Sequence, residues 1–232
     1  MKEFIRKLLK ESILDEADYP STFNIEEFKG KQTFKDRIKY IEERLTKLGA
    51  GSSRIVYQID PKTVLKLAKN KKGVAQNKVE IEYSHYGDLS HLFAEVFEYD
   101  SDGLWVEMEL ASKVTNSNFK TITGIDFKTD KPTKRTSNLP EKASYVEALQ
   151  YYYYENVKPG KNPLSQPEGY QELWEDEFVY DMFNFLGNYQ PPLGDLLRLS
   201  TYGVVKRNGQ DSIVMIDYGL DEDVYSTHYS GR

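Results

Sequence analysis

The chain has 232 residues, of which 39% are hydrophobic and 29% are charged, and its formal net charge is -6 at pH 7. This length can bury a core in one large domain or in two small ones. The acidic balance argues against general nucleic-acid binding, which usually shows a basic field. The lack of cysteine excludes disulfides, thiolate metal sites and cysteine nucleophiles, and it suits a reducing, cytoplasmic interior.

The first 47 residues predict a mostly helical segment. MKEFIRKLLKESIL spaces its apolar residues as a helix does, but it lacks the continuous apolar run of a signal peptide or a membrane span. Packing onto its own domain is favoured over contact with a membrane or a partner groove. In FKDRIKYIEERLTKL, apolar residues recur at intervals of three and four, which indicates one buried helix face through Phe34, Ile38, Ile41 and Leu45.

From residue 48 to residue 111 the pattern changes to short strands. RIVYQI, TVLKLA, LFAEVFEY and LWVEMELA are rich in β-branched and aromatic residues. The turn DPK joins the first two runs, and DSDG joins the last two as a hairpin. VAQNKVEIEYSHY, between the two pairs, predicts a helix.

The remaining chain alternates polar stretches with helices and ends in strands. Residues 112–142 are dominated by polar residues and proline and predict a long loop. ASYVEALQYYYYENV and YQELWEDEFVYDMFNFLGNY predict helices, the second ending near Gly187. The tyrosines at 151–154 favour core packing first and a partner surface second. GVVKR and SIVMID predict a hairpin that turns at Asn208-Gly209.

The stretch LGAGSSRIVY, which starts at residue 48, opens like a phosphate-binding loop. Gly49 and Gly51 stand where such a loop has its first two glycines, and Arg54 takes the place of the third. Two spaced glycines also suit an ordinary tight turn before a strand. The residues that follow must decide between the two interpretations.

Lys66, inside the apolar run TVLKLA, is the next feature. Burial of an unpaired ammonium group is unfavourable, so the lysine needs a partner. We expect Lys66 to face a phosphate and to be held by a carboxylate from the following helix, with Glu80 as the preferred partner and Glu82 as the alternative. An edge strand with Lys66 facing water is the simpler interpretation.

The order of these features over residues 48–111 resembles the small lobe of the protein kinase-like fold: glycine loop, strand, strand with lysine, helix with glutamate, hairpin. The resemblance implies a bilobal α+β protein that binds ATP. It implies a helical extension at 1–47, an antiparallel β-sheet small lobe with one helix at 48–111, and a reduced, mainly helical large lobe at 112–232 with long loops and a terminal β-hairpin. The nucleotide-binding residues that it implies are Gly49, Gly51, Val56, Lys66, the gatekeeper Met108, and the hinge residues Glu109, Leu110 and Ala111.

Two motifs near the C-terminal end extend the resemblance. Asp217 in SIVMIDYGL takes the place of the aspartate in the kinase Asp-Phe-Gly motif and implies a Mg²⁺ ligand. Asp195 in LGDLLRLSTYGVV takes the place of the catalytic aspartate, and Arg198 that of a basic residue that steadies the γ-phosphate. Ser200, or else Thr201, stands where the family has a metal-binding asparagine. The alternative role for Asp195 is to cap a helix that begins with DLLRL.

Several departures from the family pattern bear on activity. Arg54 would put a cation over the phosphates, where it closes the loop onto a nucleotide or obstructs it. Leu193 and Gly194 replace the usual histidine-arginine pair before the catalytic aspartate. Few residues follow Gly219, where a protein kinase has a long activation segment and peptide-binding helices. We therefore expect no peptide recognition of the usual kind.

Three interpretations stay open at this point. An active kinase-like protein would bind ATP and Mg²⁺ and transfer the γ-phosphoryl group to an unknown acceptor. A pseudokinase would instead serve as an interaction or structural module, with the tyrosines at 151–154 and the N-terminal helices as surfaces for a protein partner. So reduced a chain suits a phage or viral genome, which would place it in the host cytoplasm or in the virion. An unrelated α+β protein with coincidental motifs is the third interpretation.

Overall fold

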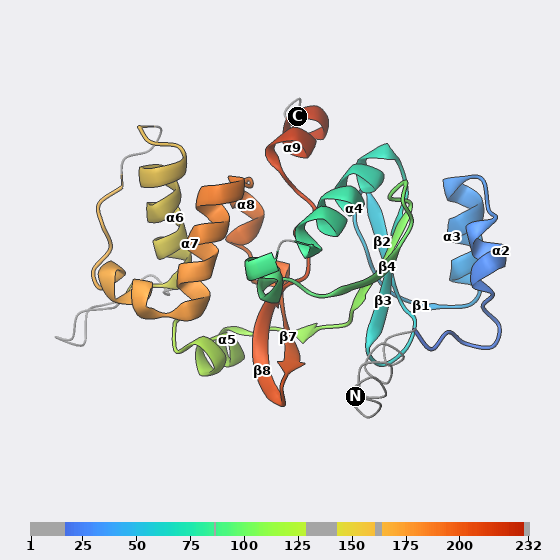
Figure 1. Ribbon diagram of the computed structural model, residues 1–232, viewed down its shortest axis with the longest axis horizontal. Coiled ribbons are helices and arrows are strands. Elements are labelled where there is room, and N and C mark those ends of the chain that lie inside the picture. The colour runs from blue at the N-terminus through green and yellow to red at the C-terminus, as the bar shows by residue number, and fades with distance from the viewer. Residues whose placement is uncertain (1–16, 86, 129–142, 161–163, 230–232) are drawn as a thin grey trace, which may run out of the picture. The chain divides into compact units, whose positions relative to one another are not determined.

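The computed structural model describes residues 17–85, 87–128, 143–160 and 164–229 (Figure 1). The chain forms two compact units: the first holds the residues up to Ser84 and Glu95–Leu110, and the second holds His85–Ala94 and the residues from Ala111 onward. Within the described ranges, no helix has both the length and the apolar character needed to span a membrane. The helix expected in MKEFIRKLLKESIL lies outside these ranges, as does the end of the predicted long loop.

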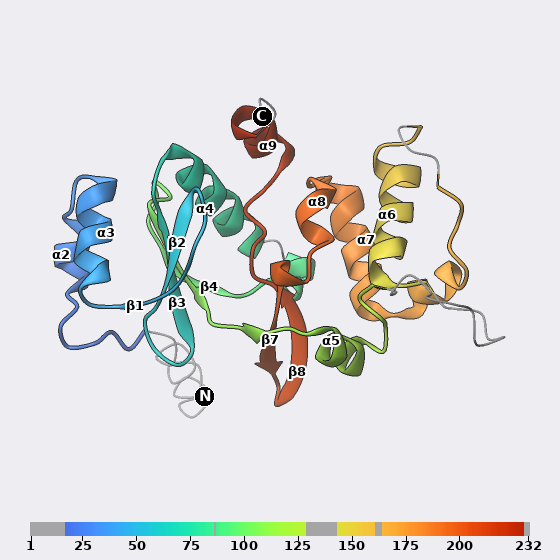
Figure 2. The same cartoon turned by 180° about the vertical axis from the view of Figure 1, so that it is seen from behind.

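The first unit contains the predicted antiparallel sheet (Figure 2). Its five strands are arranged in the order β1-β2-β3-β5-β4. Its central strand β3 is buried along its whole length, so the interpretation of Lys66 as an edge residue facing water is wrong. The β4–β5 hairpin turns at Asp100–Gly103, as DSDG predicts, and Gly103 has a φ of 80°. The strands are β1 (Thr46–Ala50), β2 (Arg54–Gln58), β3 (Thr63–Ala68), β4 (Val96–Tyr99) and β5 (Trp105–Glu109).

Helix α4 (Lys71–Ser84), which the sequence predicts, packs on the face of β3 that carries Lys66. Successive side chains of a strand point to opposite faces, so Lys66 turns away from the neighbouring leucines of the strand. Gly73 near the start of α4 lies so close to the backbone oxygen of Ser53 that a Cβ there would overlap it. This close approach fixes the beginning of α4 against the turn between β1 and β2.

The opposite face of the sheet is covered by α2 (Ile25–Lys29) and α3 (Phe34–Glu42). The helix predicted through Leu48 ends earlier, at Glu42, because the chain from Thr46 onward pairs with β2 instead. The sequence pattern does not reveal β1, since its five residues are at least partly exposed and lack β-branched alternation. The buried residues of this core are Phe23, Phe28, Tyr40, Ile41, Leu45, Ile55, Tyr57, Ile59, Leu65, Leu67 and Trp105.

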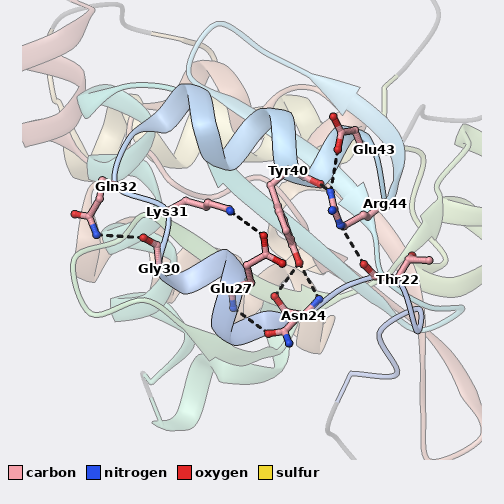
Figure 3. Close-up of polar contacts among 9 residues, drawn as sticks. All are labelled: Thr22, Asn24, Glu27, Gly30, Lys31, Gln32, Tyr40, Glu43 and Arg44. Carbon is pink, nitrogen blue, oxygen red and sulfur yellow. Dashed lines mark hydrogen bonds and ion pairs between the residues drawn. The ribbon is translucent and has the colours of Figure 1, made fainter.

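Tyr40 joins α3 to the segment around α2 (Figure 3). Its hydroxyl donates to the Asn24 carbonyl (3.1 Å) and accepts from the Asn24 N–H (3.0 Å). The Asn24 side chain in turn caps α2 by accepting from the Glu27 N–H at 2.9 Å. The Arg44 guanidinium lies 3.9 Å from the Tyr40 ring centroid and donates through Nε to the Thr22 carbonyl. These contacts hold the two short helices together over the sheet.

The second unit combines a three-stranded sheet, order β6-β7-β8, with several helices (Figure 1). The β7–β8 hairpin turns at Asn208 (φ 52°) and Gly209 (φ 83°), as predicted. An aromatic core surrounds the hydrogen bond between the Tyr145 and Tyr202 hydroxyls, which are 2.9 Å apart. The elements are η1 (Gly87–Leu92), β6 (Ser112–Lys113), α5 (Asn116–Thr123), α6 (Tyr145–Tyr152), the π-helical η2 (Tyr153–Val157), η3 (Tyr170–Glu175), α7 (Glu177–Tyr189), α8 (Leu193–Leu196), η4 (Leu199–Thr201), β7 (Tyr202–Arg207), β8 (Gln210–Met215) and α9 (Glu222–His228).

Two expectations for this unit are wrong in detail. The polar stretch predicted as a long loop contains β6 and α5, because Thr115 and Asn118 form a capping box and Phe119 is buried. The helix predicted from Tyr170 to near Gly187 is broken into a 3₁₀ segment and α7, which ends at Tyr189. The break occurs because Asp176 caps α7 by accepting from the N–H of Val179.

The tyrosines at 151–154 pack largely inward, in agreement with the prediction of core packing. Tyr153 is buried, and Tyr152 stacks on Phe183 with ring centroids 4.5 Å apart. Tyr151 meets Tyr170 edge to face at 4.7 Å. Their use as a surface for a partner stays a prediction.

Candidate functional site

Lys66 and Glu80 form a buried ion pair in the first unit. The Lys66 ammonium donates to both carboxylate oxygens of Glu80 at 2.9 Å, and the Glu80 residue is 0% exposed. The preferred pairing is therefore confirmed, whereas Glu82 is an exposed residue on the same helix. The role of Lys66 in phosphate binding stays a prediction.

Arg54 is part of the same cluster, and its side chain turns inward to Glu80; its place relative to the phosphates stays a prediction. Its Nη1 is 2.8 Å from Oε2 of Glu80 and donates to Oδ1 of Asn77 at 3.4 Å. In the β2–β3 register, Arg54 lies opposite Ala68 and Val56 lies opposite Lys66. Arg54 and Lys66 therefore share the sheet face that meets α4, and both cations reach Glu80 from it.

Asn77 is a further member of this cluster, to which the sequence analysis assigned no role at the site. It is 0% exposed, and its Nδ2 donates to the Gly103 carbonyl at 2.9 Å while its Oδ1 accepts from Arg54. Asn77 thus ties the cluster to the turn of the β4–β5 hairpin. Its place one helical turn before Glu80 was the available signal, because residues three apart on a helix share a face.

The turn between β1 and β2 is bonded to the segment that leads into α4. The Lys69 N–H donates to the Ser53 carbonyl at 2.8 Å, and Lys69 Nζ donates to the Gly51 carbonyl at 3.0 Å. Asn70 Nδ2 donates to the Ser52 carbonyl at 3.2 Å, and the Ser53 hydroxyl bonds to the Gln76 side chain. The turn that contains Gly51 is therefore bonded to α4, the helix that carries Glu80, and to the residues just before it.

The residues expected to contact a nucleotide base lie along β2 and at the end of β5. Val56 is partly exposed, and Met108 is buried between Val64 and Val96 of the neighbouring strands. The N–H groups of Glu109 and Leu110 donate to the carbonyls of Glu95 (2.8 Å) and Lys62 (2.6 Å). Both N–H groups therefore bond to carbonyl groups of the first unit, and the chain returns to the second unit at Ala111.

Asp195, in the second unit, lies within the short helix α8 and forms an ion pair. Pro192 is the N-cap of α8, so the interpretation of Asp195 as a cap is wrong. Nη1 of Arg198 is 2.9 Å from Oδ1 of Asp195. Burial raises the pKa of Asp195; the Arg198 guanidinium lowers it and the Asp217 carboxylate raises it, and the net shift is upward.

Asp217 follows the end of β8 and is exposed, while Tyr218 after it is buried. The Tyr218 hydroxyl donates to the Ala94 carbonyl at 3.0 Å, and its ring packs on Phe93 with centroids 4.6 Å apart. Asp217 and Asp195 both line one small cavity of this unit. The aromatic residue of the DYG sequence therefore anchors the segment, and the aspartate before it faces outward.

The two hydroxyl residues considered as metal ligands differ in their surroundings. Ser200 is exposed, whereas Thr201 is buried and its hydroxyl donates to the Asp195 carbonyl at 2.6 Å. Thr201 therefore supports the backbone at Asp195. In the ranges that the structure describes, no group of three or more His, Cys, Asp or Glu side chains could hold a metal ion.

The sheet topology and the ion pair together define the class of fold. The first unit places a helix between β3 and β4 of a five-stranded antiparallel sheet and pairs a β3 lysine with a glutamate of that helix. This is the small-lobe arrangement of the protein kinase-like fold. The chain therefore has an α+β, protein kinase-like fold, and the interpretation of coincidental motifs is wrong.

Comparison with solved structures finds matches at low sequence identity and low TM-score. The aminoglycoside phosphotransferase APH(2'')-Ib with bound ADP is 14% identical, with a TM-score of 0.36, and the match covers 81% of this chain and 70% of that one. Wild-type aminoglycoside 2'-phosphotransferase-IIIa with GDP is 12% identical, with a TM-score of 0.35 and coverages of 82% and 74%. A variant of the Mycobacterium tuberculosis PknI kinase domain is 12% identical, with a TM-score of 0.32 and coverages of 77% and 60%. No protein-family model and no curated protein matches the sequence.

Proposed function

We propose that the protein binds ATP with Mg²⁺ and transfers the γ-phosphoryl group to an alcohol acceptor. The observation that supports this most strongly is the buried cluster of Arg54, Glu80 and Lys66 on the sheet face that meets α4. In kinase-like proteins a β3 lysine, oriented by a helix glutamate, binds the phosphates of the nucleotide. Lys66 is held in that way by Glu80, and Arg54 adds a second contact to the same carboxylate.

The glycines before β2 support close approach by a ligand. Gly49 and Gly51 do not have a positive φ, and a Cβ on Gly49 would meet no atom within 4 Å. The fold itself therefore does not require glycine at position 49. A phosphate that approaches the backbone closely would require it. Val56, Met108 and Ala111 are the proposed contacts of the base.

Asp217 is the proposed ligand of Mg²⁺, with Ser200 as a second oxygen donor. Mg²⁺ prefers oxygen ligands and usually takes one or two protein carboxylates together with phosphate oxygens and water. An exposed aspartate and an exposed hydroxyl fit that donor set, and a cage made only of protein side chains is not needed. The bound ion would offset the negative charge of the phosphates.

Asp195 is the proposed base for the acceptor. It would orient the acceptor hydroxyl and take its proton while the acceptor oxygen bonds to the γ-phosphorus and the bond to the bridging β–γ oxygen breaks, which releases ADP. Asp195 lines the same small cavity as Asp217, the proposed Mg²⁺ ligand. Catalysis would then be mostly a matter of position and electrostatics.

Nucleotide binding without transfer is the second candidate function. The observation in its favour is the ion pair between Arg198 and Asp195, which occupies one oxygen of the proposed base. In a pseudokinase this contact would be permanent. In an active enzyme Arg198 would turn toward the γ-phosphate when nucleotide binds.

A thermal-shift titration with ATP, with and without Mg²⁺, tests nucleotide binding. A ligand at about 100 times its dissociation constant stabilises the folded state by about 2.7 kcal/mol, or roughly 5–10 °C for a chain of this size. We expect a Mg²⁺-dependent shift for the natural chain that Lys66→Met weakens and Asp217→Asn abolishes. The exposed Lys62 provides a matched control, and Lys62→Met should leave the shift unchanged. An equal shift in all four proteins would contradict the proposal.

Phosphate release from γ-labelled ATP, with and without added alcohols, separates the two candidate functions. Acceptor-dependent transfer that Asp195→Asn abolishes, with nucleotide binding retained, supports the enzyme. Nucleotide binding without transfer, unchanged in Asp195→Asn, supports the pseudokinase.

A further inference from the structure

We propose that a pocket beside Asp195 in the second unit binds a small, uncharged, ring-bearing alcohol, and that this alcohol is the phosphoryl acceptor. The acceptor role rests on the proposed function, but binding to the pocket does not. The pocket has a volume of about 560 Å³, within the range of small-molecule sites. We call it the tyrosine pocket, because its lining includes Tyr153, Tyr154, Tyr225 and Tyr229.

Aromatic rings on two elements line the tyrosine pocket. Tyr225 and Tyr229, from α9 and just beyond it, are parallel within 1° with centroids 6.1 Å apart. Tyr153 and Tyr154, from the π-helical η2, meet edge to face at 5.6 Å. Tyr225 is 42% exposed although it is a large aromatic residue. Ring faces of this kind pack best against another flat ring, so we infer a ligand that contains one.

The π-helical turn is a second indication of a binding role. The Lys158 N–H donates to the Tyr153 carbonyl, five residues earlier, at 2.9 Å. Such turns are rare and occur frequently at functional sites. Here the turn provides two of the pocket's tyrosines as well as Lys158, which also lines the pocket.

The charges around the pocket indicate an uncharged ligand. Lys158 Nζ is 3.1 Å from Oε2 of Glu222, and Arg198 Nη1 is 2.9 Å from Oδ1 of Asp195. All four residues line the pocket, so its two positive and two negative charges balance. A polycation would need a surplus of carboxylates, and a polyanion a surplus of basic groups. The structure offers neither.

The alcohol group follows from the position of Asp195. Asp195 lines the pocket, its carboxylate can accept a hydrogen bond from a hydroxyl, and it is the group proposed to take the proton during transfer. Pro192 and Leu193 add an apolar surface beside it. An acceptor would thus stack its ring on the tyrosines and direct one hydroxyl to Asp195.

Saturation-transfer NMR without nucleotide tests binding directly, with phenyl β-D-glucopyranoside as the uncharged probe. Phenyl β-D-glucuronide and spermine serve as an anionic and a polycationic comparison. We expect saturation transfer to the phenyl ring of the glucoside and weaker binding of both charged probes. No transfer from the natural chain, or a preference for either charged probe, would overturn the inference.

Variants locate the binding. Tyr225→Ala should weaken the affinity for the glucoside by about fivefold or more, because it removes a stacking ring, and Tyr225→Phe should retain it. Tyr180, which is 46% exposed and lies outside the pocket, provides the control, and Tyr180→Ala should bind as the natural chain does. Glu222→Gln adds one net positive charge to the pocket and should improve glucuronide binding relative to glucoside. Equal loss in the Tyr225 and Tyr180 variants would overturn the inference.

The thermal shift with Mg-ATP keeps this inference separate from the proposed function. A normal ATP shift without glucoside binding overturns the tyrosine pocket and leaves nucleotide binding in place. Glucoside binding without an ATP shift supports the pocket and overturns its role as an acceptor site. Glucoside binding together with ATP-dependent phosphorylation of the glucoside supports both.

Discussion

Replacement of Glu80 by glutamine is the most informative perturbation of the first unit. Glu80 is 0% exposed and receives Lys66 at 2.9 Å and Arg54 at 2.8 Å, so Glu80→Gln removes the negative charge that both cations face. At an effective dielectric constant of about 20, each contact represents roughly 5–6 kcal/mol of Coulomb attraction. Desolvation of the charges offsets much of this. Loss of one partner from a buried ion pair typically costs about 3–5 kcal/mol.

We therefore expect Glu80→Gln to lower the free energy of unfolding by about 3 kcal/mol, or the melting temperature by roughly 6–12 °C. The chain has two tryptophans, and Trp105 is buried in the first unit while Trp174 belongs to the second. In a Trp174→Phe background, urea unfolding followed by tryptophan fluorescence reports on the first unit alone.

Glu82→Gln is the matched control for this experiment, because Glu82 is exposed on the same helix. Surface replacements of this kind usually change stability by about 0.5 kcal/mol or less. If Glu80→Gln shifted the urea midpoint no more than Glu82→Gln does, the reasoning about the buried cluster would be refuted.

Three further predictions concern stability. Burial raises the pKa of Glu107 to about 7, so the folded state binds the proton of this carboxyl more tightly than the unfolded state does. The free energy of unfolding should therefore fall as the pH rises from about 4.5 to about 7. Glu107→Gln should remove this slope in a pH series of urea titrations. Gly73→Ala should destabilise the chain by about 1–3 kcal/mol in thermal melts, because its Cβ would overlap the Ser53 backbone, whereas Gly49→Ala should be near neutral. Tyr202→Phe should cost about 1–2 kcal/mol, seen by Trp174 fluorescence, since its hydroxyl donates to the Leu196 carbonyl at 2.9 Å. A flat pH profile of stability for the natural chain would count against the argument about Glu107. An unchanged stability of Gly73→Ala or of Tyr202→Phe would count against the argument made for that residue.

Much of the small-lobe architecture could be predicted because its signals are local. Alternating β-branched and aromatic residues identify β2, β3 and β5, and the turns at Gly103 and Asn208-Gly209 carry the residues that a positive φ favours. The Lys66–Glu80 pair was accessible for a related reason, since a lysine within an apolar strand requires a carboxylate nearby. Strand β1 and helix α5 were missed, because pairing with β2 and burial of Phe119 are tertiary effects.

The features of the candidate site also fall into two groups, those that the sequence predicts and those that depend on tertiary structure. The sequence by itself determined that Lys66 would need a carboxylate and that Asp217 would follow a buried strand, since both follow from residue type and periodicity. Only the tertiary structure decided that Arg54 turns inward to Glu80, because the β2–β3 register sets which sheet face it shares. Only the tertiary structure also brought η2, α8 and α9 around the tyrosine pocket, because its residues are far apart in the chain and nothing in their local spacing indicates that they meet.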